Sequence, residues 1–112
     1  VSFLARPAIA RRFRRRFPES LTGAPLLLPT DHAAVRRELD RWFDSIGVAP
    51  RVVAEFQDSA LLKIVAREGK GIIPVPSVVE DEVRRDYRLE PLGRTEAVKE
   101  RFFLISVEKR LK

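Results

Sequence analysis

The stretch "RVVAEFQDSALLKIVAREGKGIIPV" (residues 51–75) contains the pattern that decides the fold. A β-rich run at 51–56 is followed by apolar residues at helical spacing over 59–68, and then by a second β-rich run at 71–75. Asp58 is well placed to cap the helix, and Gly69 to end it. A strand, a helix and a strand joined by short turns predict two parallel strands with the helix packed across the sheet.

The same alternation of strands and helices extends in both directions along the chain. The expected strands are 1–5, 25–29, 51–56, 71–75, 89–92 and 101–107. The expected helices begin at Pro7, at Thr30 or Asp31 as alternative caps, at Asp58, and at Pro76. In the last helix, Glu80 with Arg84 and Asp81 with Arg85 are spaced as i,i+4 ion pairs. This order predicts an α/β fold of three layers, with a mainly parallel sheet and helices on both faces.

Composition narrows the function classes. The chain has 112 residues, enough for one domain, and no cysteine, which fits a cytoplasmic protein and removes disulfides and thiolate metal sites. No run is long and apolar enough to cross a bilayer. There is no glycine-rich phosphate loop and no nucleophile motif, and the only histidine, His32, has few partners for metal or base chemistry. We expect no enzyme activity, no cofactor, no metal site and no membrane partner.

The basic run "IARRFRRRFPESL" (residues 9–21) contains most of the arginines behind the net charge of +6. Six of the 22 basic residues are arginines within residues 1–16, which contain no acid, and the other 16 are matched by 16 acidic residues. Ile9, Phe13 and Phe17 recur at helical spacing up to Pro18, so the arginines can form the solvated face of a helix. The alternative is a basic nucleic-acid-binding module that uses Arg6–Arg16.

Polar residues follow three of the expected parallel strands, at 28–32, 55–59 and 75–77. Ligands of parallel sheets bind beyond the carboxyl ends of the strands, where the next helices present free N–H groups. If the strands are parallel, the side chains that meet at this edge are Thr30, Asp31, Phe56, Asp58 and Ser77. Capping of the helices explains part of this set without any ligand.

The residues 55–83, together with "LLLP", "LDRWFDSIGV" and "ERFFLIS", resemble the effector-binding domain of LysR-type transcriptional regulators. Within that family they look most like the branch that activates sodium–proton antiporter genes. The family implies an N-terminal winged helix-turn-helix for promoter DNA and a two-subdomain effector domain that resembles periplasmic binding proteins. Residues 1–112 would then be the second effector subdomain, without the DNA-binding domain and the first subdomain.

The resemblance also implies partners for particular residues. A small-molecule or cation effector would bind between the two subdomains, and its contacts here would be Thr30, Asp31, Phe56 and Asp58. Leu61, Leu62, Ile64 and Val65 cover an arc wider than one buried stripe. Related regulators form a dimer through this helix and the strand before it. We therefore expect an interface of Val53, Leu61, Leu62, Ile64 and Val65, a tetrameric full-length protein, and self-association of the fragment as a dimer.

Overall fold

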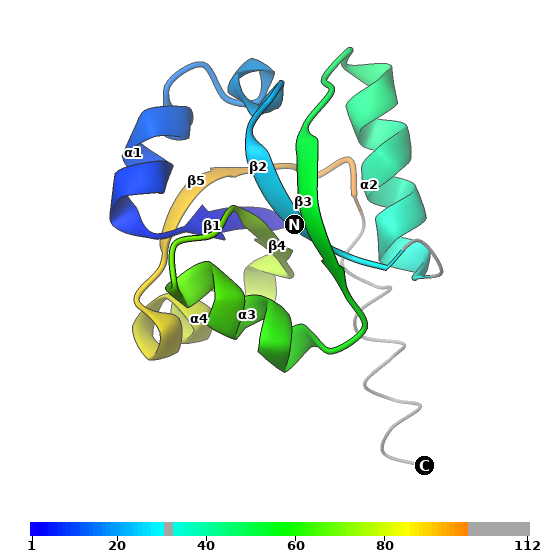
Figure 1. Ribbon diagram of the computed structural model, residues 1–112. Helices are drawn as coiled ribbons and strands as arrows, with labels where there is room; N and C mark the ends of the chain where they lie inside the picture. Colours follow the sequence, from blue (N-terminus) through cyan, green and yellow to red (C-terminus); the bar gives the residue numbers. More distant parts are fainter. Residues whose placement is uncertain (31–32, 99–112) are drawn as a thin grey trace.

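The structure, a computed structural model, describes residues 1–30 and 33–98 (Figure 1). Its strands are β1 (Ser2–Ala5), β2 (Pro25–Pro29), β3 (Arg51–Phe56), β4 (Ile73–Val75) and β5 (Glu90–Arg94). Its α-helices are α1 (Pro7–Arg14), α2 (Ala34–Ser45), α3 (Ser59–Arg67) and α4 (Glu80–Tyr87), with short 3-10 turns η1 (Glu19–Leu21) and η2 (Ser77–Val79). The expected strand at 101–107 and the side chains of Asp31 and His32 lie outside the described residues.

The strands form a two-stranded sheet, β3-β2, and a three-stranded sheet, β4-β1-β5. The isolated bridge between Leu26 and Ile72 places them side by side in the order β3-β2-β4-β1-β5. β2 and β3 pair in parallel, and β1 pairs antiparallel with both β4 and β5. A parallel bridge joins the two parts, because Leu27 N donates to Ile72 O and Ile72 N donates to Pro25 O, both at 2.9 Å. The predicted α/β fold is confirmed. Four strands point the same way. β1 is the exception: it runs in the opposite direction, between β4 and β5 and not beside β2.

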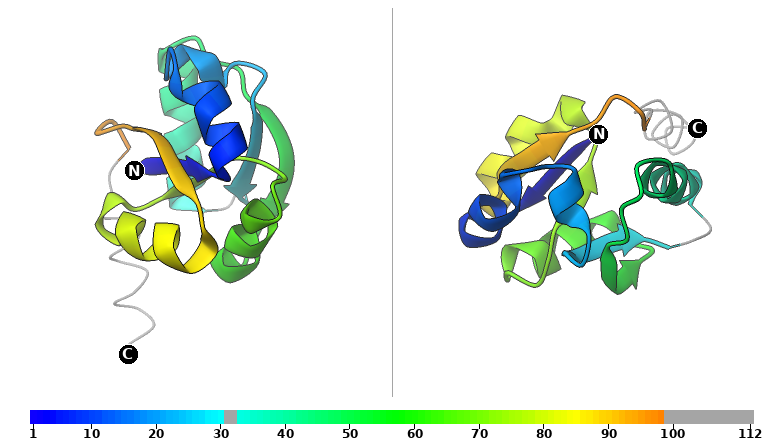
Figure 2. Two further views of the ribbon diagram at one scale, coloured as in Figure 1. Left: turned by 90° about the vertical axis from the view of Figure 1, so that its left-hand side faces the viewer. Right: turned by 90° about the horizontal axis from the view of Figure 1, so that it is seen from above.

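Helices cover both faces of the sheet, as the sequence predicts (Figures 1 and 2). α1 and α2 pack on one face around a core that includes Phe3, Leu26, Leu28, Trp42 and Ile72. On the other face, α3 and α4 cover a second core. Its buried members are Leu4, Leu27, Leu62, Ala66, Ile73, Val75, Val83 and Leu89. Leu26 and Leu28 face one core and Leu27 the other, which explains why the run "PLLLP" is apolar throughout.

The α1 stripe packs as expected, but the helix ends earlier than Pro18 requires. Ile9, Phe13 and Phe17 lie against the first core. α1 stops at Arg14, and Arg16 takes a left-handed backbone with φ of 67°. The turn directs the Phe17 ring onto Phe3, at 5.7 Å between centroids, so packing rather than the proline alone sets the end of the helix.

The starts of α2 and α3 differ in how far the sequence predicts them. Asp58 caps α3, accepting a hydrogen bond from Ala60 N at 2.8 Å, and Gly69 ends the helix with φ of 82°. The prediction that Thr30 caps α2 is wrong, because α2 begins at Ala34 with Ala33 at the N-cap. Thr30 N instead donates to Phe56 O, which keeps this residue extended alongside β3.

The ion pairs predicted within α4 are also wrong. Glu80 binds Arg94 of β5 rather than Arg84. Arg84 Nη2 lies 3.3 Å from Glu90 Oε2, and Arg85 pairs with its neighbour Asp86. Glu80 turns inward to a strand that lies 14 residues further along the chain, so local helical spacing does not select its partner.

Candidate functional site

The three strand-to-helix junctions lie at one edge of the sheet. β2, β3 and the run that leads into β4 are parallel neighbours, so their carboxyl ends meet there. We call this edge the rim and define it by Thr30, Phe56, Asp58 and Ser77. Thr30 N donates to Phe56 O at 3.1 Å, which joins the first two junctions directly. Ser77 Oγ lies 2.8 Å from Ser2 Oγ, so the third junction contacts the start of β1.

The rim side chains differ in exposure. Thr30 and Phe56 are half-buried, and Phe56 also packs against the second core. Asp58 is exposed, and its Oδ1 is committed to the α3 cap. Within residues 1–30 and 33–98 the Thr30 hydroxyl has no hydrogen-bond partner, so it can donate to or accept from a ligand. Asp31, the fourth expected effector residue, lies outside the described residues.

Arg36 binds the ends of β2 and β3 next to the rim, a role that the sequence does not predict. This side chain is nearly buried, and its Nη1 donates to Pro29 O at 2.8 Å and to Glu55 Oε2 at 2.6 Å. Its Nε donates to Asp40 at 3.1 Å. Burial lowers the pKa of Arg36, but the hydrogen bonds to Glu55 and Asp40 outweigh it and leave that pKa above its usual value. The one sequence signal is that Arg36 falls on the same helical stripe as the buried Leu39 and Phe43.

A second missed pair ties α4 to the end of β5. Arg94 Nε and Nη2 donate to the two carboxylate oxygens of Glu80, at 2.8 and 2.6 Å. Glu80 is only 3% exposed, whereas the Arg94 side chain is 61% exposed. The Arg94 hydrogen bonds hold the pKa of Glu80 below its ordinary value, against the opposing effect of burial. Ser2 pairs with Arg94 in the β1–β5 ladder, so this ion pair lies near the third junction.

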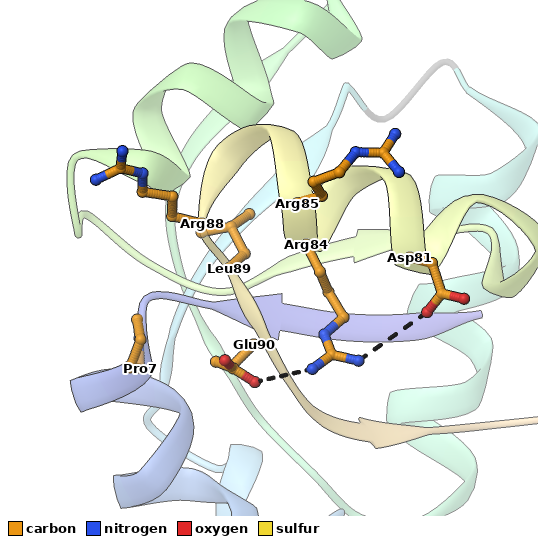
Figure 3. Close-up of a pocket in the computed structure, with 7 residues that line it drawn as sticks. All are labelled: Pro7, Asp81, Arg84, Arg85, Arg88, Leu89 and Glu90. Carbon is orange, nitrogen blue, oxygen red and sulfur yellow. Dashed lines mark hydrogen bonds and ion pairs between the residues drawn. The ribbon is translucent and has the colours of Figure 1, made fainter.

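A cavity of about 400 Å³ lies elsewhere, between the start of α1 and the turn from α4 to β5 (Figure 3). Pro7 and Leu89 line it together with three arginines and two acids. Arg84 in its wall already contacts Glu90 and, at 4.0 Å, Asp81. The positive charge of Arg84 is therefore balanced within the chain, and the cavity shares no residue with the rim.

The residues expected at an interface divide into two groups. Val53, Leu61 and Ile64 are exposed, at 45, 47 and 36%. Leu62 is 5% exposed and belongs to the second core, and Val65 is half-buried against the same core. Assigning Leu62 to an exposed face is therefore wrong, because its side chain points into the sheet. Since β3 is an edge strand, the exposed residues form an apolar face on β3 and α3.

No helix in the described part of the chain is long and apolar enough to cross a membrane. Within the same residues no three His, Cys, Asp or Glu side chains gather as a metal-ion site would require.

A family model for the LysR substrate binding domain matches residues 2–111. The transcriptional activator protein NhaR of Escherichia coli (strain K12) is 30% identical over 93 residues, or 83% of this chain and 31% of the relative. NhaR of Shigella flexneri matches equally. This chain thus spans about a third of these curated relatives. A solved effector-binding domain of Citrobacter freundii carrying three substitutions shares the fold, with a TM-score of 0.61 and 22% identity over 84% of this chain and 46% of that one.

Proposed function

The chain belongs to the LysR substrate-binding domain family, and from this membership we propose that it is the ligand-sensing second subdomain of a LysR-type transcriptional activator. Its relatives are transcriptional activators, so a regulatory role is favoured over catalysis. The effector would bind between the rim and a first subdomain. The observation that carries the proposal is the convergence of three strand-to-helix junctions at one edge, with Thr30 and Phe56 in direct contact.

The effector would act by favouring one arrangement of two subdomains over another. A ligand shifts such an equilibrium only by its differential affinity for the two states. The subdomain described here would supply one wall of the cleft, and the shift would change how a tetramer holds promoter DNA through its DNA-binding domains. The expected cytoplasmic location stays a prediction of the sequence.

Two classes of effector are considered for the rim, a cation and a small organic anion. The antiporter branch of the family suggests sodium, which prefers oxygen ligands such as the Thr30 hydroxyl and Asp58 carboxylate. Glu55 is less suited to a cation, because Arg36 already binds it at 2.6 Å. The start of α3 offers N–H groups to an anion, but the Asp58 carboxylate stands at the same place.

Titration of a regulator that contains both subdomains tests the proposal. NaCl at constant ionic strength, with KCl as the balancing salt, and succinate are titrated separately by calorimetry. Heat from one of them identifies the effector class, and the Thr30→Val variant should weaken that binding roughly three- to tenfold through one lost hydrogen bond. Thr22→Val, in the turn before β2 at the opposite edge, is the matched control and should leave binding unchanged. Equal effects of the two variants would remove Thr30 from the site.

The apolar face on β3 and α3 would serve assembly. Exposed, contiguous apolar side chains rimmed by polar ones mark protein interfaces. We assign Val53, Leu61 and Ile64, with Val65 at the margin, to contacts between copies of the regulator. In the full-length protein this face would help to form a tetramer, and in the isolated subdomain a dimer.

A further inference from the structure

Four arginines at the end of α1 and just after it are exposed, with no carboxylate partner in the described part of the chain. Arg11, Arg12, Arg15 and Arg16 are all exposed, and we call these four the arginine face. Among the described residues no carboxylate lies within 4.0 Å of any of their guanidinium groups, although ion pairs are common elsewhere in this chain. Arg6 and Arg14 donate to the backbone oxygens of Arg67 and Pro91, which leaves their charges uncompensated. The net charge of the chain is therefore concentrated on α1 and the residues that flank it.

Two arginines also occupy backbone positions that favour glycine. Arg16, just after α1, has φ of 67°, and Arg88, just after α4, has φ of 57°. Side chains other than glycine are strained in this region, and such strain is found at functional sites. Arg88 lines the same cavity as Pro7, the first residue of α1 (Figure 3). The helix dipole favours basic residues at the end of a helix, which applies to Arg16 and Arg88 but not to all four residues of the arginine face.

The face of α1 that lies opposite the arginines distinguishes a membrane surface from a nucleic acid as the binding partner. Ala10 is buried, and Ile9 and Phe13 pack against the first core, so α1 has no free apolar face to insert into a bilayer. A surface that offers only charge matches a phosphate backbone. We propose that the arginine face binds the phosphate backbone of double-stranded DNA without reading its sequence.

The binding would add to whatever a separate DNA-binding domain contributes. In an activator bound to its promoter, the arginine face would hold flanking DNA against the effector domain. The proposal does not depend on effector binding at the rim, because α1 and the rim are separate surfaces. A variant that loses effector binding at the rim can still be tested for DNA binding at the arginine face, and the reverse.

The test measures how DNA binding by the chain depends on salt. Fluorescence anisotropy with a random 30-base-pair duplex gives the binding constant at KCl concentrations between 50 and 200 mM. Each phosphate contact contributes about −0.9 to the slope of log K against log salt. The R11Q/R12Q/R15Q variant should therefore make the slope shallower by about 2.7. The control R37Q/R41Q/R51Q removes the same charge from exposed arginines on α2 and β3 and should keep the parent slope. Circular dichroism verifies that both variants are folded.

A second variant keeps the test decisive if the triple variant does not fold. Arg16→Gly relieves the left-handed strain, so it should raise the melting temperature and still make the slope shallower by about 0.9. The proposal is overturned if the parent slope corresponds to less than one phosphate, or if the control loses as much as the arginine-face variant. Binding to vesicles containing phosphatidylglycerol, without binding to DNA, would also overturn it.

Discussion

Replacing Asp58 with alanine removes the side-chain cap of α3 at the rim. Asp58 Oδ1 accepts a hydrogen bond from Ala60 N at 2.8 Å, and loss of such a cap costs about 1 kcal/mol of folding free energy. For 112 residues the entropy of unfolding near the melting temperature is about 0.24 kcal/mol/K, so the melting temperature should fall by about 4 °C. Calorimetric melts at pH 7 measure this shift.

The Asp58→Asn variant separates the cap from the charge. Asparagine caps as well as aspartate, so Asp58→Asn should melt within about 1 °C of the parent chain although it loses the same charge as Asp58→Ala. If the two variants lose the same stability, the hydrogen bond to Ala60 is not what stabilises α3. In the two-subdomain regulator, Asp58→Asn should weaken effector binding only if the carboxylate contacts the effector. If Asp58→Asn binds the effector as the parent does, the only role of Asp58 is to cap α3.

Three further predictions follow from packing and charge. The folded-state pKa of Glu80 lies below its ordinary 4.5, so the Glu80–Arg94 pair stabilises the chain fully above pH 4.5 and loses this effect as the pH falls through the folded-state pKa. Urea unfolding from pH 7 to pH 3 should show this loss in the parent and less of it in Arg94→Gln; parallel curves would contradict the pair's role. A Cβ on Gly93 would clash with the Phe17 ring, so Gly93→Ala should cost roughly 1–3 kcal/mol in the same assay, and a neutral result would mean that the ring moves freely. The L61K/I64K variant should abolish self-association in sedimentation experiments without lowering the melting temperature, whereas Val78→Lys, at another exposed apolar residue, should leave assembly intact.

The features that the sequence predicts well are local ones. The bounds of β2 and β3 agree with the expected runs, and Asp58 and Gly69 delimit α3 because cap and stop act within a few residues. The meeting of the three junctions also follows, since parallel neighbours have to end at one edge.

The features that the sequence misses depend on residues far apart in the chain. Arg36 reaches Glu55 on a neighbouring strand, and Glu80 reaches Arg94 rather than the arginine one helical turn away. The direction of β1 is equally non-local, because alternating strands and helices do not specify which strands become neighbours. The start of α2 depends on the Thr30–Phe56 hydrogen bond, which no capping pattern contains.

The central place of β1 has a consequence for biosynthesis. This segment precedes both of its partners in the chain, because its ladders require residues 73–75 and 90–94. Contacts this distant in sequence close long loops and form slowly. Until both partners emerge, Phe3 and Leu4 have no sheet to join, and a nascent chain would carry this apolar strand exposed. A chaperone that holds exposed apolar segments would therefore act on β1 until β4 and β5 have emerged.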